Sequence, residues 1–283
     1  MESIQQIRAR IQSISSTRQI TSSMRLVATS KIERLRQRLE ENRAFQQATG
    51  ELILRSAQQP EAARHPYVAG RAGGRRLVIV VGGDRGLCGG YSTNVCRTAL
   101  DSMAEDTAIL TVGLKTHEYF ARRRPGDVVY AATGMSEHPF FEDAVDLAER
   151  AVTLYNGGTV GEVRVIYTRF LNMLSAEAVD RRLLPLDIPP AEGTQPQIAH
   201  EPGCHALLDQ AVPFHIAGEL FAAIMESSLC EQSSRIVSMD TAAKNSDNMI
   251  EALTLRYNQA RQSAITMELS EIMSGASAVQ GDG

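Results

Sequence analysis

Both ends of the chain carry apolar residues at helical spacing. Near the N-terminus these residues recur every three or four positions at Ile4, Ile7, Ile11 and Ile14, and a related stripe resumes at Ile20, Met24 and Val27 and then at Ile32, Leu35 and Leu39. Such a stripe marks one face of a helix, and here it shifts phase around residues 15–17. We therefore predict one helix from about Ser3 to Ala57, roughly 80 Å long at about 1.5 Å per residue.

The C-terminal end repeats this design. Its apolar positions alternate between spacings of three and four, as in a coiled-coil seam, at Ile250, Leu253, Tyr257, Ala260, Ala264 and Met267. The stripe then shifts to Ile265, Leu269, Ile272, Ala276 and Val279. This pattern predicts a helix from Phe214 to about Val279, roughly 100 Å long. Both predicted helices are longer than a compact globule of this chain, about 50 Å across, so we expect them to project.

Proline, glycine and charge separate these ends from the middle. All ten prolines lie between Pro60 and Pro213, and glycine is concentrated in the same region. Residues 1–58 carry a net charge of +5 and residues 214–283 a net charge of −5. Each charge set could be a solvated helix face, but opposite signs favour pairing of the two helices. We predict an antiparallel coiled coil of helices 1–58 and 214–283, with a central domain at 59–213.

The central region alternates between strand-like and helix-like segments. Apolar runs lie at residues 77–81, 108–114, 127–132 and 163–170, and helix-like stretches at 91–105, 115–123 and 141–156. This alternation predicts a Rossmann-like α/β domain with a largely parallel sheet. Residues 178–186 follow the last run closely, as an antiparallel edge hairpin would. Residues 189–203 are rich in proline and glycine and predict a surface loop.

A glycine-rich stretch, GGDRGLCGGYSTN (Gly82 to Asn94), follows the first predicted strand. Glycine after a strand is typical of phosphate-binding loops. However, no Gly-Lys-Ser/Thr follows, the glycines do not fit G-x-G-x-x-G, and Asp84 would repel a phosphate. A nucleotide-dependent enzyme would also leave the long terminal helices unexplained. The stretch is therefore better interpreted as a tight structural turn or a protein contact.

Composition excludes several other classes of protein. A net charge of −4 gives no basic excess for nucleic acid. The four cysteines and six histidines match no metal spacing, and Cys204-His205 is interpreted as an incidental pair. The charged N-terminus is unlike a secretory signal, and no apolar run approaches the roughly 20 residues of a membrane span. We expect no metal, cofactor or catalytic site, and attachment to a membrane only through partners.

Three motifs, in order, resemble one family. STRQITSSMRLVATSKI (16–32), GDRGLCGGYSTN (83–94) and the block from Met239 to Ala278 look like the signatures of the γ subunit of rotary F-type ATP synthases. The resemblance implies a paired-helix rotor inside an α3β3 hexamer. The α/β domain would then lie outside the hexamer, beside an ε subunit and a membrane ring of c subunits. Ion flow would turn the rotor, at the cytoplasmic face of a cell membrane.

The same resemblance implies contacts with the β subunits. Arg85 and Cys88 match positions facing an acidic lever loop, and Arg261 and Gln262 match a pair that meets a catch loop. Other matching positions are Met24, Thr266, Glu268, Ser270 and Glu271. Each could instead be a solvated helix position, and Met24 could be coiled-coil core. Arginine suits the contacts because its planar fork binds carboxylates through two hydrogen bonds.

Two departures and one alternative stay open. Ser22-Ser23 replaces the Lys-Ala of many relatives, which removes a charge, and the cysteine pair of the chloroplast version is missing, which favours a bacterial type. The alternative is a coiled-coil scaffold with an inserted α/β domain. The sequence does not distinguish protons from sodium ions as the driving ion. It also does not indicate the number of c subunits in the ring, whether an ε subunit inhibits hydrolysis, or how stable the coiled coil is outside the complex.

Overall fold

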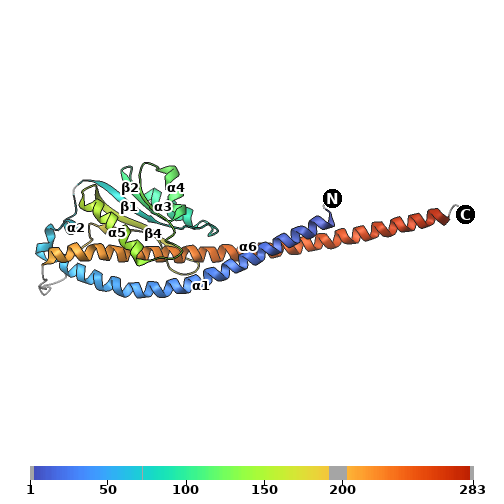
Figure 1. The fold of residues 1–283 in the computed structure, drawn as a ribbon, viewed down its shortest axis with the longest axis horizontal. Helices are drawn as coiled ribbons and strands as arrows, with labels where there is room; N and C mark the ends of the chain where they lie inside the picture. The colour runs from blue at the N-terminus through green and yellow to red at the C-terminus, as the bar shows by residue number, and fades with distance from the viewer. Residues whose placement is uncertain (1–2, 72, 191–202, 281–283) are drawn as a thin grey trace. The chain divides into compact units, whose positions relative to one another are not determined.

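Two long helices and a five-stranded sheet make up the chain (Figure 1). The computed structural model describes residues 3–71, 73–190 and 203–280, with side chains of the last helix described as far as residue 274. The helices are α1 (Ile4–Ala57), α2 (Pro66–Ala69), α3 (Tyr91–Ser102), α4 (Leu114–Arg123), α5 (Phe141–Asn156) and α6 (Cys204–Gln280), with a short 3-10 helix at Pro60–Arg64. The chain divides into two units, residues 28–235 and residues 1–27 with 236–283. The predicted boundaries at residues 58 and 213 stay a proposal.

The sheet confirms the predicted α/β architecture. Its strands are β1 (Arg75–Val81), β2 (Thr107–Val112), β3 (Val128–Ala132), β4 (Val160–Phe170) and β5 (Ala176–Leu184), in the order β3-β2-β1-β4-β5. The first four strands are parallel, and β5 pairs antiparallel with β4, as the hairpin prediction required. Because β1 to β4 are parallel, their carboxyl ends meet at one edge of the sheet. Most of the predicted loop at 189–203 lies outside the described residues.

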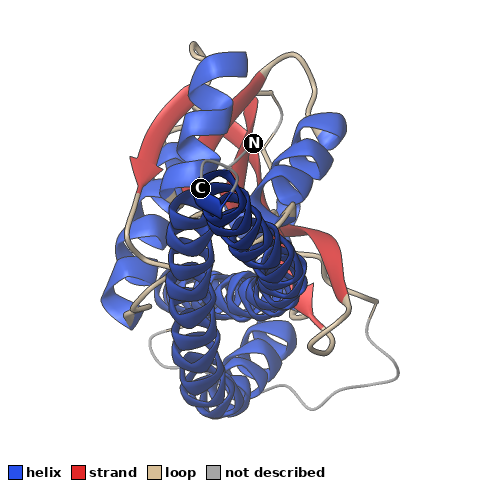
Figure 2. Cartoon of the chain, turned by 90° about the vertical axis from the view of Figure 1, so that its right-hand side faces the viewer, coloured by secondary structure: helices blue, strands red, loops and turns tan. Residues whose placement is uncertain are grey.

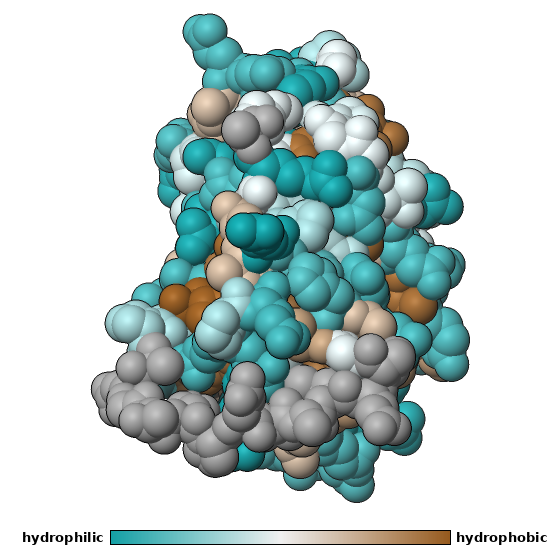
Figure 3. All heavy atoms as spheres, turned by 90° about the vertical axis from the view of Figure 1, so that its left-hand side faces the viewer, coloured by the Kyte–Doolittle hydropathy of each residue, from teal (hydrophilic) through white to brown (hydrophobic). Residues whose placement is uncertain are grey.

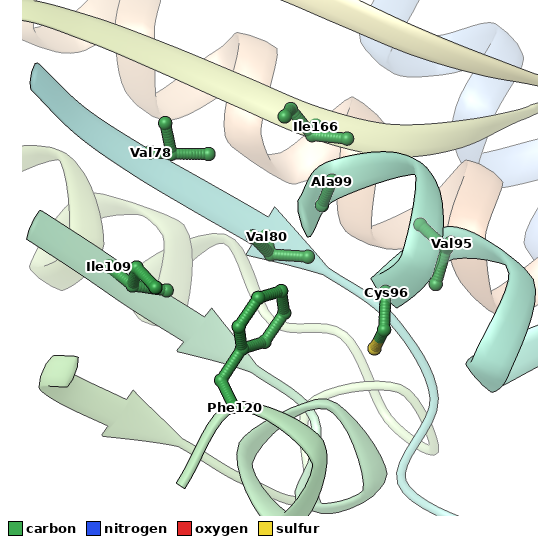
Figure 4. Close-up of a cluster of buried hydrophobic side chains, with 8 residues drawn as sticks. All are labelled: Val78, Val80, Val95, Cys96, Ala99, Ile109, Phe120 and Ile166. Atoms are coloured by element: carbon green, nitrogen blue, oxygen red, sulfur yellow. The ribbon is translucent and has the colours of Figure 1, made fainter. Parts of the chain in front are cut away.

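Alternate residues of β1 point to opposite faces of the sheet, and both faces are buried. On one face the side chains of Val78 and Val80 pack with those of Val95, Cys96 and Phe120 from α3 and α4 (Figure 4). The residues of β1 on the other face, Leu77 and Ile79, are also fully buried. This continuous apolar run is typical of a parallel strand covered on both sides by helices.

Helix α6 begins ten residues before the predicted start at Phe214 and includes Pro213. A proline inside a helix costs about 3 kcal/mol, which is why the sequence predicted a boundary there. Three apolar side chains of these added turns, Cys204, Leu208 and Val212, are at most 3% exposed. Their burial is worth about 1.5–3 kcal/mol for each large side chain and offsets the cost of the proline.

The first and last helices are antiparallel within the unit formed by residues 3–27 and 236–280. Arg18 forms an ion pair with Asp247, and Arg25 forms one with Asp240, so seven residues forward on α1 match seven residues back on α6. Viewed nearly end on, the two helices lie side by side (Figure 2). The predicted antiparallel coiled coil is confirmed.

The predicted seam of α1 is partly wrong. Ile20 and Val27 are 60% and 57% exposed, whereas Thr21 and Ala28 are buried. Because Ile14, Thr21 and Ala28 are spaced by seven, the heptad continues without the predicted phase shift. The buried residues in this part of α1, Thr21 and Ala28, are polar or small. The spacing of the large apolar residues therefore indicated a face of the helix that is in fact exposed.

The seam of α6 ends earlier than predicted. Leu253 is buried and Ala264 is half-buried, but Met267 is 63% exposed. The ion-pair register places the start of the described α1 opposite Arg261, so residues 265–274 face no described part of α1. The last predicted seam positions, Ala276 and Val279, lie outside the described side chains.

Helix α6 also holds one stretch that is long and apolar enough to cross a membrane by length and composition. The expectation that the chain has no such run is wrong by this measure. Half of the stretch is buried inside the chain, and core helices of soluble proteins meet the same criterion. The burial accounts for the apolar composition of the stretch.

Candidate partner interface

The glycine-rich loop leaves β1 at the carboxyl edge of the sheet and leads into α3. Close packing explains its first two glycines. A Cβ at Gly82 would lie 2.3 Å from Thr116 Oγ1, and a Cβ at Gly83 would lie 2.8 Å from Ser92 Oγ and 3.1 Å from Glu231 Oε2. These glycines let the loop pack against α3, α4 and α6.

Asp84 fills an anion site formed by the start of α4 and the segment after β3. The carboxylate is largely buried and accepts three backbone hydrogen bonds, from Leu114 N at the start of α4 (2.8 Å), Gly134 N (2.9 Å) and Ser136 N (2.9 Å). Helix N-termini and converging N–H groups are typical anion sites. Because the anion here is a side chain of the protein, these N–H groups are already satisfied.

A buried ion pair fastens the loop to α6. Arg235 Nη2 donates to Glu231 Oε1 at 2.6 Å, and the side chains are 7% and 2% exposed. Glu231 Oε1 also accepts from Arg85 N at 3.3 Å, and Arg235 Nη2 donates to Gly86 O at 3.2 Å. One turn of α6 therefore holds the loop backbone at two points.

The Arg85 side chain points outward from this fixed loop and is 67% exposed. It forms an ion pair with Glu137 at 2.7 Å, and the other oxygen of Glu137 pairs with Lys31 of α1 at 2.9 Å. The hydrogen bond from Lys31, together with the charges of Lys31 and Arg85, holds the pKa of Glu137 below its usual value. Arg85 is thus an accessible cation, oriented by one carboxylate.

The Cys88 side chain faces inward. It is 3% exposed and packs with Tyr91 and Cys230, with Phe170 against the cluster. Burial, and then the nearby charge of Glu231, raises the pKa of the Cys88 thiol, which stays protonated at neutral pH. The predicted partner contact at Cys88 would therefore have to be made by the backbone or by its neighbour Leu87, which is 61% exposed.

The predicted contact residues of the last helix are all exposed. They are Arg261, Gln262, Thr266, Glu268, Ser270 and Glu271. Thr266 Oγ1 donates back to Gln262 O at 2.9 Å, and the other side chains of the group face solvent. Met24 is half-buried and, by the ion-pair register, lies opposite Thr241, about 30 Å along α6 from Arg261.

Sequence reasoning missed the Glu231–Arg235 pair. Its only signal is a Glu and an Arg four residues apart, which on most helices marks an exposed pair. It also missed Leu87, which adopts a left-handed φ of 63° that is unusual for a residue with a side chain. Among the described residues, no group of His, Cys, Asp or Glu side chains could hold a metal ion.

Comparison with known proteins agrees with this arrangement. A family described as ATP synthase matches residues 3–279. The ATP synthase gamma chain of Clostridium acetobutylicum is 36% identical over 97% of both chains. The ATP synthase gamma chain of Desulforamulus reducens is 34% identical over 99% of this chain and all of the relative.

Solved structures share the fold. A chain of the mitochondrial ATP synthase rotor of Euglena gracilis superposes with a TM-score of 0.66 at 17% identity, over 93% of this chain and 98% of that chain. A central-stalk chain of the Tetrahymena thermophila enzyme gives 0.61 at 24% identity, over 79% and 99%. The two long terminal helices, the five-stranded sheet that lies between them in sequence, the loop motif and the full-length match lead to one conclusion: the chain belongs to the ATP synthase γ chain family.

Proposed function

We propose that this chain is the central rotor shaft of an F-type ATP synthase, coupling ion flow through a membrane ring to ATP synthesis and hydrolysis in an α3β3 hexamer. The observation that carries the proposal is similarity over essentially the whole of both chains to bacterial ATP synthase gamma chains. A coiled-coil scaffold would explain the helices but not this full-length match.

The helix pair supplies a physical basis for coupling. Arg261 is exposed on one helix, and apolar side chains such as Ile265, Leu269 and Ile272 are exposed beyond it. These residues are spaced by four, four and three, so they lie on one face of the helix, and a rod with one such face presents a different surface to each of three identical β subunits. Each subunit is then biased towards a different conformation, and rotation exchanges those conformations.

In this proposal the chain performs no chemistry itself. Its partners are the α, β and ε subunits and the c-ring, and it lies at the cytoplasmic face of the membrane, held there by the complex. The contacts with β subunits are made by the loop around Arg85 and Cys88, by Met24, and by the group from Arg261 to Glu271. The Asp84 carboxylate uses the N–H groups of Leu114, Gly134 and Ser136, so these three donors are already satisfied without a bound phosphate.

Co-purification tests the proposal. A tagged chain, expressed in its native host and recovered from gently solubilised membranes, is expected to bring α, β and ε subunits with ATPase activity. Recovery of the chain as a homodimer without ATPase would favour the scaffold. ATP turnover by the purified chain alone, abolished by a substitution at Asp84, would favour an enzyme.

Within the assembled complex, Arg261→Ala is expected to slow ATP-driven rotation roughly tenfold, the loss expected for one charged hydrogen bond. Arg122→Ala, which removes an exposed arginine of α4 outside the predicted contacts, is the matched control. Failure of the Arg261 variant to assemble would make this residue structural.

A further inference from the structure

The segment that joins α1 to β1 contains a buried histidine whose two ring nitrogens are both hydrogen-bonded. His65 is 1% exposed and stands at the N-cap of α2, where its Nδ1 accepts a hydrogen bond from Tyr67 N at 3.2 Å. Because a backbone N–H can only donate, Nδ1 carries no proton, and Nε2 donates to Asp209 Oδ1 at 3.2 Å. The fold therefore holds His65 as one neutral tautomer.

The start of α6 makes further contacts with the same segment. His205 Nε2 donates to Glu61 O of the 3-10 helix at 2.9 Å, and the Cys204 thiol donates to Glu61 Oε2 at 3.8 Å. The rings of His65 and His205 lie 5.1 Å apart. We name the contacts among His65, Glu61, Cys204, His205 and Asp209 the histidine clasp. The clasp fastens the first turns of α6 to the 3-10 helix and α2 (Figure 1).

The part of α6 that the clasp holds, residues 204–212, is weakened by the proline that follows it. Pro213 has no N–H, so position 213 cannot donate the helix hydrogen bond to Asp209 O, four residues earlier. These first turns therefore depend on side-chain contacts, which are the burial of Cys204, Leu208 and Val212 and the bonds of the clasp. Loss of the clasp removes part of that support.

Protonation of His65 is incompatible with these contacts. A proton on Nδ1 would face the N–H of Tyr67, so two donors would meet and the N-cap bond of α2 would be lost. The titratable groups around the ring are Asp209 and His205 of α6 and Tyr67 of α2, with Tyr155 of α5 behind Tyr67. Asp209 attracts a charged ring, but its side chain is 67% exposed and water screens the attraction. Burial outweighs Asp209 and lowers the pKa of His65 below its ordinary value of 6.5.

We propose that the histidine clasp is an acid-sensitive switch, in which protonation of His65 releases residues 204–212 of α6 from the segment that follows α1. A histidine that folding keeps neutral contributes stability above its unfolded pKa, and this stability is lost as the pH falls below that value. The face of the molecule at this end is mostly hydrophilic (Figure 3), so water around the clasp can supply the proton. The switch lies within one chain and goes beyond the proposed function.

Hydrogen exchange of the full chain, followed by mass spectrometry, tests the proposal. Between about pH 7.5 and about pH 5, protection factors corrected for the intrinsic effect of pH are expected to fall roughly tenfold in residues 61–69 and 204–212, the change that one pKa unit supplies. In His65→Asn the amide oxygen can still cap α2 but does not titrate, so protection there should not depend on pH. His117→Asn on α4 is the matched control and should keep the wild-type fall.

Two outcomes would overturn the proposal: wild-type protection that does not change with pH, or an equal fall in His65→Asn, which would assign the effect to another group such as His205. Asp209→Asn gives a second measure at an exposed residue, which keeps the proposal testable if His65→Asn does not fold. It removes the attraction for the charged ring and should make the fall larger than in the wild type. An equal or smaller fall would contradict the role of His65. None of these measurements depends on assembly with other subunits.

Discussion

The α/β unit and the helix pair bury their side chains to very different extents. In the α/β unit, Ile79, Leu110 and Phe120 are fully buried. In the helix pair of residues 3–27 and 236–274, the most buried large side chains, Ile7, Met239 and Leu253, remain 4–7% exposed. Large apolar side chains from Leu255 to Met273 are 46–71% exposed.

Ionic contacts follow the same division. The α/β unit contains a buried pair, Glu231–Arg235, whereas the side chains of the pair Arg18–Asp247 are about half exposed. The α/β unit thus has a core that supports its own fold. The helix pair carries apolar surface that no described part of the chain covers, and exposed apolar surface of this kind is typical of interaction sites.

The largest effect that we expect in the α/β unit comes from Glu231→Gln. This change leaves the charge of Arg235 buried and unpaired, which costs about 3–5 kcal/mol. Urea unfolding monitored by tyrosine fluorescence would measure it, since six of the seven tyrosines lie within residues 67–167. Glu231→Leu with Arg235→Met, which removes both charges, should recover most of the stability, and a mild single variant would mean that water reaches the pair.

Two leucine substitutions compare the regions directly. Leu110→Ala removes a fully buried side chain and should lower the free energy of unfolding by about 2–5 kcal/mol. Leu269→Ala removes the same atoms from a residue that is 56% exposed, and should change stability by less than about 0.5 kcal/mol. Circular dichroism during urea unfolding of the isolated chain would measure both. Equal losses of stability would contradict the difference in burial between the α/β unit and the helix pair.

Asp84→Asn is expected to have a smaller effect, about 1–3 kcal/mol, because an amide cannot accept all three backbone hydrogen bonds. Asp84→Ala would leave the same N–H groups without an anion. Added phosphate should then raise the melting temperature of the alanine variant but not that of the wild type. The absence of any phosphate effect would show that the donors do not form an anion site once Asp84 is removed.

Among the substitutions that remove a polar contact, the smallest expected effect is that of Asp247→Asn in the helix pair. It removes an exposed ion pair with Arg18 and should cost about 0.2–1 kcal/mol at low salt. At about 1 M NaCl, where the Debye length is about 3 Å, the loss should largely disappear. A double-mutant cycle with Arg18→Gln isolates the pair, and a coupling that survives high salt would contradict a surface contact.

Local patterns predicted most of the fold. The β4 run and its hairpin partner were expected at residues 163–170 and 178–186, and the structure places the strands at Val160–Phe170 and Ala176–Leu184. Helix α5 has the predicted bounds. These elements could be predicted because apolar periodicity and breaks at glycine or proline act within a few residues.

Contacts between distant residues decided the rest. The start of α6 depends on burial of Leu208 and Val212, which outweighs the cost of Pro213, and the seam of α1 passes through Thr21 and Ala28, which hydropathy does not mark. The inward side chain of Cys88 and the pairing of Glu231 with Arg235 likewise depend on how the loop meets α6.

The sequence by itself determined the family, the antiparallel helix pair and the strand order along the chain, because these follow from motifs, periodicity and charge. Only the tertiary structure decided which loop residues face outward and that Asp84 takes the place of a bound anion. The reason is physical: burial and hydrogen bonding of a side chain depend on neighbours far away in sequence, such as Glu231 for the glycine-rich loop and Ser136 for Asp84.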